Sequence, residues 1–184
     1  MRAAWLALVL AACRAAGGGG PYAPAEQAGR NTVRAQELSS EAADMVDSDP
    51  DAAERMLREA LGADLFFGPA HNNLGVLYLK QGKLYEAAGE FEWARKLMPG
   101  HPDPRMNLAL TLEQAGQVDE AIQTYKTALE VYPGHIATVQ ALARLEVTSG
   151  HKSEELEGWL DQIALQGETQ MWKEWADRER MRTR

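Results

Sequence analysis

Residues 68–101, GPAHNNLGVLYLKQGKLYEAAGEFEWARKLMPGH, are followed directly by residues 102–135, PDPRMNLALTLEQAGQVDEAIQTYKTALEVYPGH, and the two stretches share a period of 34 residues. Leucine, glycine, alanine, an aromatic residue and proline recur at the same places in both, and part of the pattern continues into residues 136–169. A fixed period of this length indicates a stack of similar supersecondary units. The recurring residues are Leu74, Leu108 and Leu142; Gly82, Gly116 and Gly150; Ala87 and Ala121; Phe91 and Tyr125; Ala94 and Ala128; and Pro99 and Pro133.

The 34-residue period resembles a known helix–turn–helix repeat, in which each recurring position has a mechanical role. Small residues let two helices of one unit cross closely, and a glycine ends the first helix with a left-handed residue. The aromatic residue fills the gap toward the next hairpin, and the proline stops the second helix. The small residues on the first helices are Gly75, Ala109 and Ala143, and those on the second helices are Ala87 and Ala121.

The pattern resembles the tetratricopeptide repeat, a unit of two helices and 34 residues. Tyr78 matches a further signature position, whereas His71 and Arg105 replace the usual aromatic residue near the start of the repeat. The resemblance implies an all-α fold, a solenoid of three to four repeats with a C-terminal capping helix. The abundance of Ala, Leu, Glu, Gln and Met agrees with a helical chain.

The sequence divides around the two clear repeats. We expect a degenerate first repeat at 32–67, where Ala53, Leu57 and Ala60 keep the second-helix positions, and a degenerate fourth repeat at 136–169. Terminal repeats are atypical in such arrays because they cap an exposed core. Residues 170–184 are expected to form the capping helix and tail, with Trp159, Trp172 and Trp175 serving either as cap or as an exposed docking patch.

The chain opens with a lipoprotein-like leader. Arg2 precedes an uncharged apolar run, Ala3 to Ala12, that is shorter than the roughly 20 residues needed to span a bilayer. The run ends Leu10-Ala11-Ala12-Cys13, which resembles the bacterial lipobox, so residues 1–12 are expected to be a signal peptide and Cys13 the lipidated residue. An ordinary secretory leader or an uncleaved anchor are the alternatives.

A tether is expected at residues 13–31, because four consecutive glycines, Gly17 to Gly20, do not hold regular structure. The sequence therefore predicts a membrane-anchored lipoprotein of a bacterial cell envelope that faces the periplasm or the exterior. Arg14 follows Cys13 in place of the Asp that resembles an inner-membrane retention signal, which favours the outer membrane.

The resemblance also implies a concave face lined by the first helices, where a partner would bind. An apolar strip of Val76, Leu79, Met106 and Leu110 is either open to a peptide or helix of a partner or covered in part by the N-terminal helix or tail. The expected partner-binding groove consists of Asn72, Val76, Leu79, Lys80, Met106, Leu110, Glu113, Gln114, Gln140, Arg144 and Val147.

Asn73 and Asn107 occupy equivalent positions in the two clear repeats. In family members that grip a peptide C-terminus, such asparagines help to hold the carboxylate, but here the next equivalent is Ala141 and position 72 is not lysine. We expect these asparagines to bond neighbouring helices or a bound backbone instead.

Other function classes find little support. The formal net charge of −8 disfavours nucleic acid as a partner. No catalytic motif and no cofactor-binding motif occurs, and His101 and His135 are expected to be turn residues and not metal ligands. The sequence therefore predicts a non-enzymatic scaffold that binds another protein, with self-association or a soluble periplasmic chaperone as alternatives.

Overall fold

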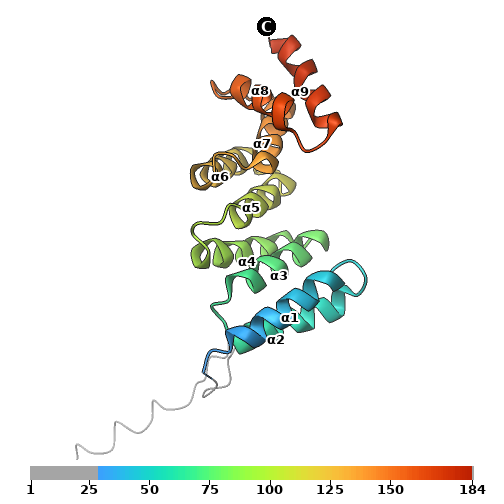
Figure 1. Ribbon diagram of the computed structural model, residues 1–184, viewed down its shortest axis with the longest axis vertical. Helices are drawn as coiled ribbons and strands as arrows, with labels where there is room; N and C mark the ends of the chain where they lie inside the picture. The colour runs from blue at the N-terminus through green and yellow to red at the C-terminus, as the bar shows by residue number, and fades with distance from the viewer. Residues whose placement is uncertain (1–28, 184) are drawn as a thin grey trace, which may run out of the picture.

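The computed structural model describes residues 29–183, which are all-helical and form the predicted α-solenoid (Figure 1). The predicted signal peptide at 1–12, the proposed lipidation site Cys13 and most of the tether lie outside the described residues. Within the described range no strand occurs. The helices are α1 (Thr32–Met45), α2 (Pro50–Ala63), α3 (Gly68–Lys80), α4 (Leu84–Leu97), α5 (Asp103–Gln114), α6 (Val118–Val131), α7 (Ile136–Ser149), α8 (Leu156–Gln166) and α9 (Gln170–Thr183).

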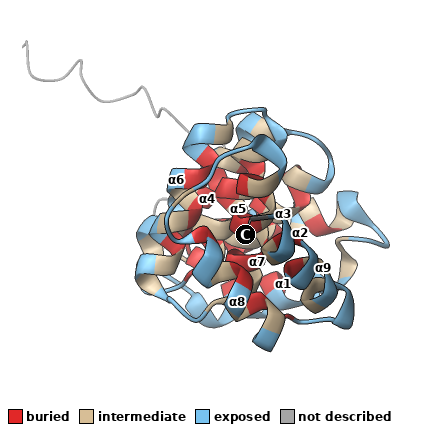
Figure 2. Ribbon diagram, turned by 90° about the horizontal axis from the view of Figure 1, so that it is seen from above, coloured by how far each residue is buried: buried red, intermediate tan, exposed pale blue. Residues whose placement is uncertain are grey.

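The helices stack in chain order along the long axis, with α1 and α2 at one end and α8 and α9 at the other (Figure 1). Seen from the end of the stack, the buried residues lie where helices face one another and the exposed residues surround them (Figure 2). None of the helices in residues 29–183 has the length and apolar character that a membrane span requires.

Three glycines at the ends of first helices make the hairpin turns. Gly82, Gly116 and Gly150 have φ angles of 72°, 77° and 79°, in the left-handed region that residues with a side chain avoid. The left-handed residue lets the next amide reach back, so Lys83 N donates to the carbonyl of Tyr78 at 2.9 Å. The first helices α3, α5 and α7 are therefore each followed by a left-handed glycine, whereas α1 ends at Met45 without one.

Close crossings of paired helices account for the small residues. A Cβ atom placed on Gly75 of α3 would lie 2.6 Å from Cε1 of Phe91 on α4, which is closer than carbon atoms approach without displacement. Phe91 is itself completely buried. At the equivalent crossing of α5 and α6, Ala109 and Tyr125 share a buried cluster and are also fully buried.

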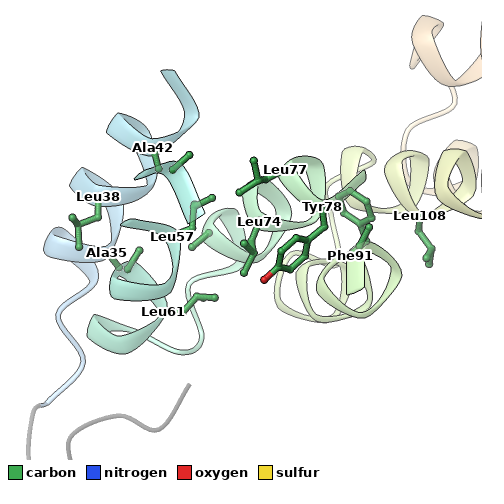
Figure 3. Close-up of a cluster of buried hydrophobic side chains, with 14 residues drawn as sticks. Ala35, Leu38, Ala42, Leu57, Leu61, Leu74, Leu77, Tyr78, Phe91 and Leu108 are labelled. Carbon is green, nitrogen blue, oxygen red and sulfur yellow. The ribbon is translucent and has the colours of Figure 1, made fainter. Parts of the chain in front are cut away.

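The core consists of three successive clusters. The first extends from Ala35 and Leu38 on α1 through Leu74 on α3 to Leu108 on α5 (Figure 3). Neighbouring hairpins thus bury each other's apolar faces, as expected of a repeat array. The predicted structural residues that are buried are Ala53, Leu57, Ala60, Leu74, Gly75, Tyr78, Ala87, Phe91, Ala94, Leu108, Ala109, Ala121, Tyr125, Ala128, Leu142 and Ala143, whereas Pro99 and Pro133 are exposed just beyond α4 and α6.

The C-terminal helix α9 closes the array. Trp159, Trp172 and Trp175 are half-buried and pack against the third cluster, which includes Leu160 of α8 and Ala176 of α9. The rings of Trp172 and Trp175 meet edge to face at 5.4 Å. These contacts support the interpretation of the tryptophans as a cap over the last hairpin.

The start of α1 is fixed more firmly than the predicted tether implies. Arg30 donates from Nε to Asp64 at 2.9 Å, and Asn31 N donates to the carbonyl of Ala63 at 2.9 Å. The Asn31 side chain also caps α1 by accepting from Arg34 N. Arg30 and Asn31 therefore belong to the folded unit, and the predicted tether boundary at residue 31 extends too far.

Candidate functional site: the face of the first helices

Hydrogen bonds between successive repeats join the first helices α1, α3 and α5 to one another. Asn73 Nδ2 on α3 donates to Ser39 Oγ on α1 at 3.1 Å, and Asn107 Nδ2 on α5 donates to Asn72 Oδ1 on α3 at 3.1 Å. These bonds run along the stack from one first helix to the next. We call the surface formed by the predicted groove residues together with the adjoining residues of α1 the first-helix face.

The amides of Asn73 and Asn107 therefore bond neighbouring helices, which was one of the two roles expected of them. Each Nδ2 already has an acceptor within the chain, since Asn73 also donates to the carbonyl of Ser39 at 3.3 Å. With Ala141 at the next equivalent position, the face lacks the set of donors that a carboxylate clamp requires.

Two hollows lie between α1 and α3 on this face. The larger, of about 430 Å³, is lined by Gln36, Ser39, Ser40, Phe67, Pro69 and Asn73. The smaller, of about 140 Å³, is lined by Ala43, Val46, Asp47, Asn73, Val76 and Lys80. Val76, Ala43 and Val46 supply apolar surface to the smaller hollow, so α1 narrows the predicted apolar strip at Val76 without covering it.

Most of the predicted groove residues are only partly accessible. Leu79 packs against the first core cluster, Met106 against the second and Val147 against the third. Their side chains thus serve both the core and the surface. Of the predicted set, Lys80 and Gln114 are exposed, and the half-buried members are Asn72, Val76, Leu79, Met106, Leu110, Glu113, Arg144 and Val147.

Gln140 does not belong to the accessible face, and its assignment to the groove is wrong. Its side chain is only 2% exposed, and Glu168 uses both ends of the amide. Gln140 Nε2 donates to Glu168 Oε2 at 3.0 Å, and Glu168 N donates to Gln140 Oε1 at 3.1 Å. The turn between α8 and α9 folds back onto α7 at this point, so Gln140 anchors the C-terminal cap.

The charged groove residues are paired within the chain. Arg144 on α7 donates from Nη2 to both oxygens of Glu113 on α5, at 2.7 and 3.0 Å, and Lys80 pairs with Asp47. Burial raises the pKa of the Tyr125 hydroxyl, and the Glu113 carboxylate raises it further. The hydroxyl therefore stays protonated and donates to Glu113 at 3.3 Å.

Three histidine arrangements lie away from the first-helix face. His101 and His135, from successive turns, flank the carboxylate of Asp103 at 3.5 and 3.4 Å. Among residues 29–183, no group of three His, Cys, Asp or Glu side chains converges on a common metal position. The two histidines lie in the turns, and His135 also contacts Thr138 at 2.7 Å.

His151 lies between Ser149 at 2.8 Å and Asp119 at 3.0 Å, an arrangement that resembles a catalytic triad. The Ser149 hydroxyl donates to the carbonyl of Leu145 at 2.6 Å, so it accepts from His151 and does not offer its proton to the imidazole. All three side chains are exposed. The arrangement ties the start of α6 to the end of α7.

His71 forms a buried polar pair with Glu90, which the sequence pattern did not predict. Its Nδ1 lies 2.7 Å from Glu90 Oε2, and its Nε2 lies 2.9 Å from the carbonyl oxygen of Leu65. The ring of Trp93 stacks on the imidazole, with the two ring centroids 5.7 Å apart. Both ring nitrogens face oxygen atoms of the chain, so the ring is held in one orientation. A signal was present, because His71 occupies the aromatic position of the repeat.

Comparisons with known proteins agree with this architecture. Two tetratricopeptide-repeat family models match, one at residues 78–145 and the other at residues 43–92. None of the curated proteins matches the sequence significantly.

Solved structures show the same fold at low sequence identity. The first tetratricopeptide domain of Spaghetti (RPAP3), solved with the HSP90 peptide SRMEEVD, has a TM-score of 0.61 at 16% identity, over 65% of this chain and 96% of that one. MamA has a TM-score of 0.60 at 17% identity, over 80% of this chain and 81% of its own.

A tetratricopeptide repeat protein from Parabacteroides merdae has a TM-score of 0.65 at 23% identity, over 79% of this chain. This chain spans 58% of that protein's length. Residues 43–145 of the present chain therefore consist of tetratricopeptide repeats, and its described part has the fold of a tetratricopeptide solenoid.

Proposed function

We propose that this chain is a protein-binding scaffold that holds a peptide or helix of a partner on its first-helix face. The observation that carries the proposal is the pair of hollows between α1 and α3, where apolar Val76 lies beside amides and hydroxyls. Apolar contacts would supply affinity, and the polar groups at the edge would orient the partner. The neighbouring structure of Spaghetti with a peptide supports this use of the fold.

The partner-binding proposal is tested by two neutral substitutions on the face. Val76→Gln with Leu110→Gln removes apolar surface without changing charge, and we expect it to abolish recovery of partners from envelope extract. Tyr85→Gln is the control, because Tyr85 is 91% exposed on α4, a second helix outside the first-helix face. If both variants recovered all partners equally, the first-helix face would not be the surface that binds them.

We further propose that the chain is anchored to a bacterial envelope membrane through a lipid on Cys13, with the outer membrane favoured. The support is the sequence Leu10-Ala11-Ala12-Cys13 after an apolar run. Several acyl chains on one residue anchor a protein firmly, whereas one chain does not. Mass spectrometry of the mature N-terminus tests this, since a cleaved but unmodified Cys13 would leave the soluble chaperone as the better account.

The second candidate for the partner is another copy of this chain. Met171 and Leu165 are 69% and 77% exposed near the cap, which favours a contact between copies at this end. Light scattering of the purified chain over a range of concentrations tests it, and a monomer at high concentration would exclude this candidate.

A further inference from the structure

One face of α1 carries a line of carboxylates. Glu37, Glu41 and Asp44 lie at helical spacing and, with Val33, Gln36 and Ser40, line a shallow depression along the helix. Gln36 and Ser40 also line the larger hollow between α1 and α3. Because Gln36 and Ser40 are shared, the depression that the acidic side chains line adjoins the larger hollow of the first-helix face.

These carboxylates are only partly neutralised within residues 29–183. Glu37 lies 3.8 Å from Arg34, which binds Glu59 more closely at 3.0 Å. Glu41 and Asp44 are exposed and form no ion pair with another described residue. This end of the face thus keeps an excess of negative charge.

The other end of the face has no such excess. Glu113 and Arg144 neutralise each other through two short hydrogen bonds. The unpaired negative charge of the face is therefore concentrated at the α1–α3 end. At this end Val46 and Val76 supply apolar surface to the smaller hollow.

We propose that the α1–α3 end of the first-helix face docks a cationic amphipathic segment of a partner protein, an inference that rests on the proposed scaffold function. Apolar side chains of the segment would occupy the hollow beside Val46 and Val76. Its Lys or Arg side chains would lie against Glu41 and Asp44, since complementary charge at the rim of an interface sets partner choice and association rate.

The segment proposed to dock here has the opposite charge to the peptide bound by one structural neighbour. The HSP90 peptide SRMEEVD carries three acidic side chains and one arginine. On α1 of the present chain such a peptide would meet Glu41 and Asp44 and be repelled. The two charge classes of peptide therefore give a direct comparison.

The test uses two fluorescein-labelled amphipathic peptides of equal length, one built from Leu and Lys and the other from Leu and Glu. Fluorescence anisotropy with the intact chain should show binding of the Leu/Lys peptide, weakening as salt is raised, and no binding of the Leu/Glu peptide. Glu41→Lys with Asp44→Lys should lower the affinity for the Leu/Lys peptide about tenfold.

A matched variant separates the face from net charge. Glu130→Lys with Glu154→Lys makes the same change in total charge at exposed positions on α6 and before α8, and it should change the affinity less than about twofold. Circular dichroism is the check that both variants keep their helices. An equal loss in the two variants, or equal binding of the two peptides, would overturn the inference.

A neutral variant, Val76→Gln, separates this inference from the scaffold function. If Val76→Gln weakens binding while Glu41→Lys with Asp44→Lys does not, the scaffold stands and the charge preference is overturned. If neither change has an effect, both proposals are overturned.

Discussion

Gly75 and Gly89 offer a test of the helix crossing, because the same substitution to alanine should have opposite effects at the two sites. Gly75 lies inside α3 and Gly89 inside α4. A Cβ atom at Gly89 would have nothing within 4 Å, whereas one at Gly75 would lie 2.6 and 2.8 Å from two ring atoms of Phe91. Phe91 is fully buried, so its ring cannot turn out into solvent without disturbing the residues packed around it.

The magnitude follows from two terms. Replacing a helix-interior glycine by alanine stabilises by about 0.5–1 kcal/mol, and this gain applies to both sites. Overpacking at a buried contact costs about 1–3 kcal/mol and applies only at Gly75. The free energy of unfolding of Gly75→Ala should therefore be lower than that of Gly89→Ala by about 1–3 kcal/mol.

Urea denaturation followed by far-UV circular dichroism measures the difference, and each kcal/mol corresponds to a change in Tm of about 2–4 °C for a chain of this size. Adding Phe91→Leu to Gly75→Ala should recover part of the loss, since the two residues contact each other. If Gly75→Ala were as stabilising as Gly89→Ala, the close crossing of α3 and α4 would be refuted.

Three further predictions concern buried polar contacts. Burial acts to raise the pKa of Asp64, but hydrogen bonds from Arg30, Thr32 and the Phe66 amide outweigh this effect and lower the pKa. The stability that the Asp64 carboxylate contributes is therefore complete above the unfolded pKa of about 3.9, and it is lost as the pH falls through the lower folded pKa. In acid titration by circular dichroism, Asp64→Asn should therefore lose less stability below about pH 4 than the wild type, and identical profiles would contradict this. Gln140→Ala should speed amide hydrogen exchange in α9, because it removes both hydrogen bonds to Glu168 at a cost of about 1–2 kcal/mol, whereas Gln114→Ala should not. His71→Phe should lower the free energy of unfolding in urea by about 1–3 kcal/mol, because Glu90 Oε2 loses its contact with His71 Nδ1. His71→Phe with Glu90→Leu should regain most of this loss, and no regain would contradict a buried polar pair.

The repeated residues made much of the fold predictable. Gly82 and Gly116 recur because only glycine readily adopts the left-handed turn, and Gly75 recurs as a small residue because Phe91 lies against it. These constraints are local to one hairpin and therefore visible in the sequence. They led to an all-α solenoid, which the structure confirms.

The parts that the sequence did not reveal depend on contacts outside the repeat. Gln140 occupies a groove position, but it is buried by a turn near Glu168 that has no counterpart in the other repeats. Arg30 follows a glycine-rich stretch, and its fixed position depends on Asp64, 34 residues later. The negative charge at Glu41 and Asp44 was visible in the sequence, but its position beside the hollows was not.

Site-specific photo-crosslinking shows whether the first-helix face holds the partner. A photo-reactive phenylalanine analogue at exposed Ser40 on α1 samples this face, and the same analogue at exposed Gln123 on α6 samples another surface. We expect a partner crosslink from Ser40 and none from Gln123 when the chain is irradiated in envelope extract. A partner that crosslinks from Gln123 and not from Ser40 would contradict this expectation.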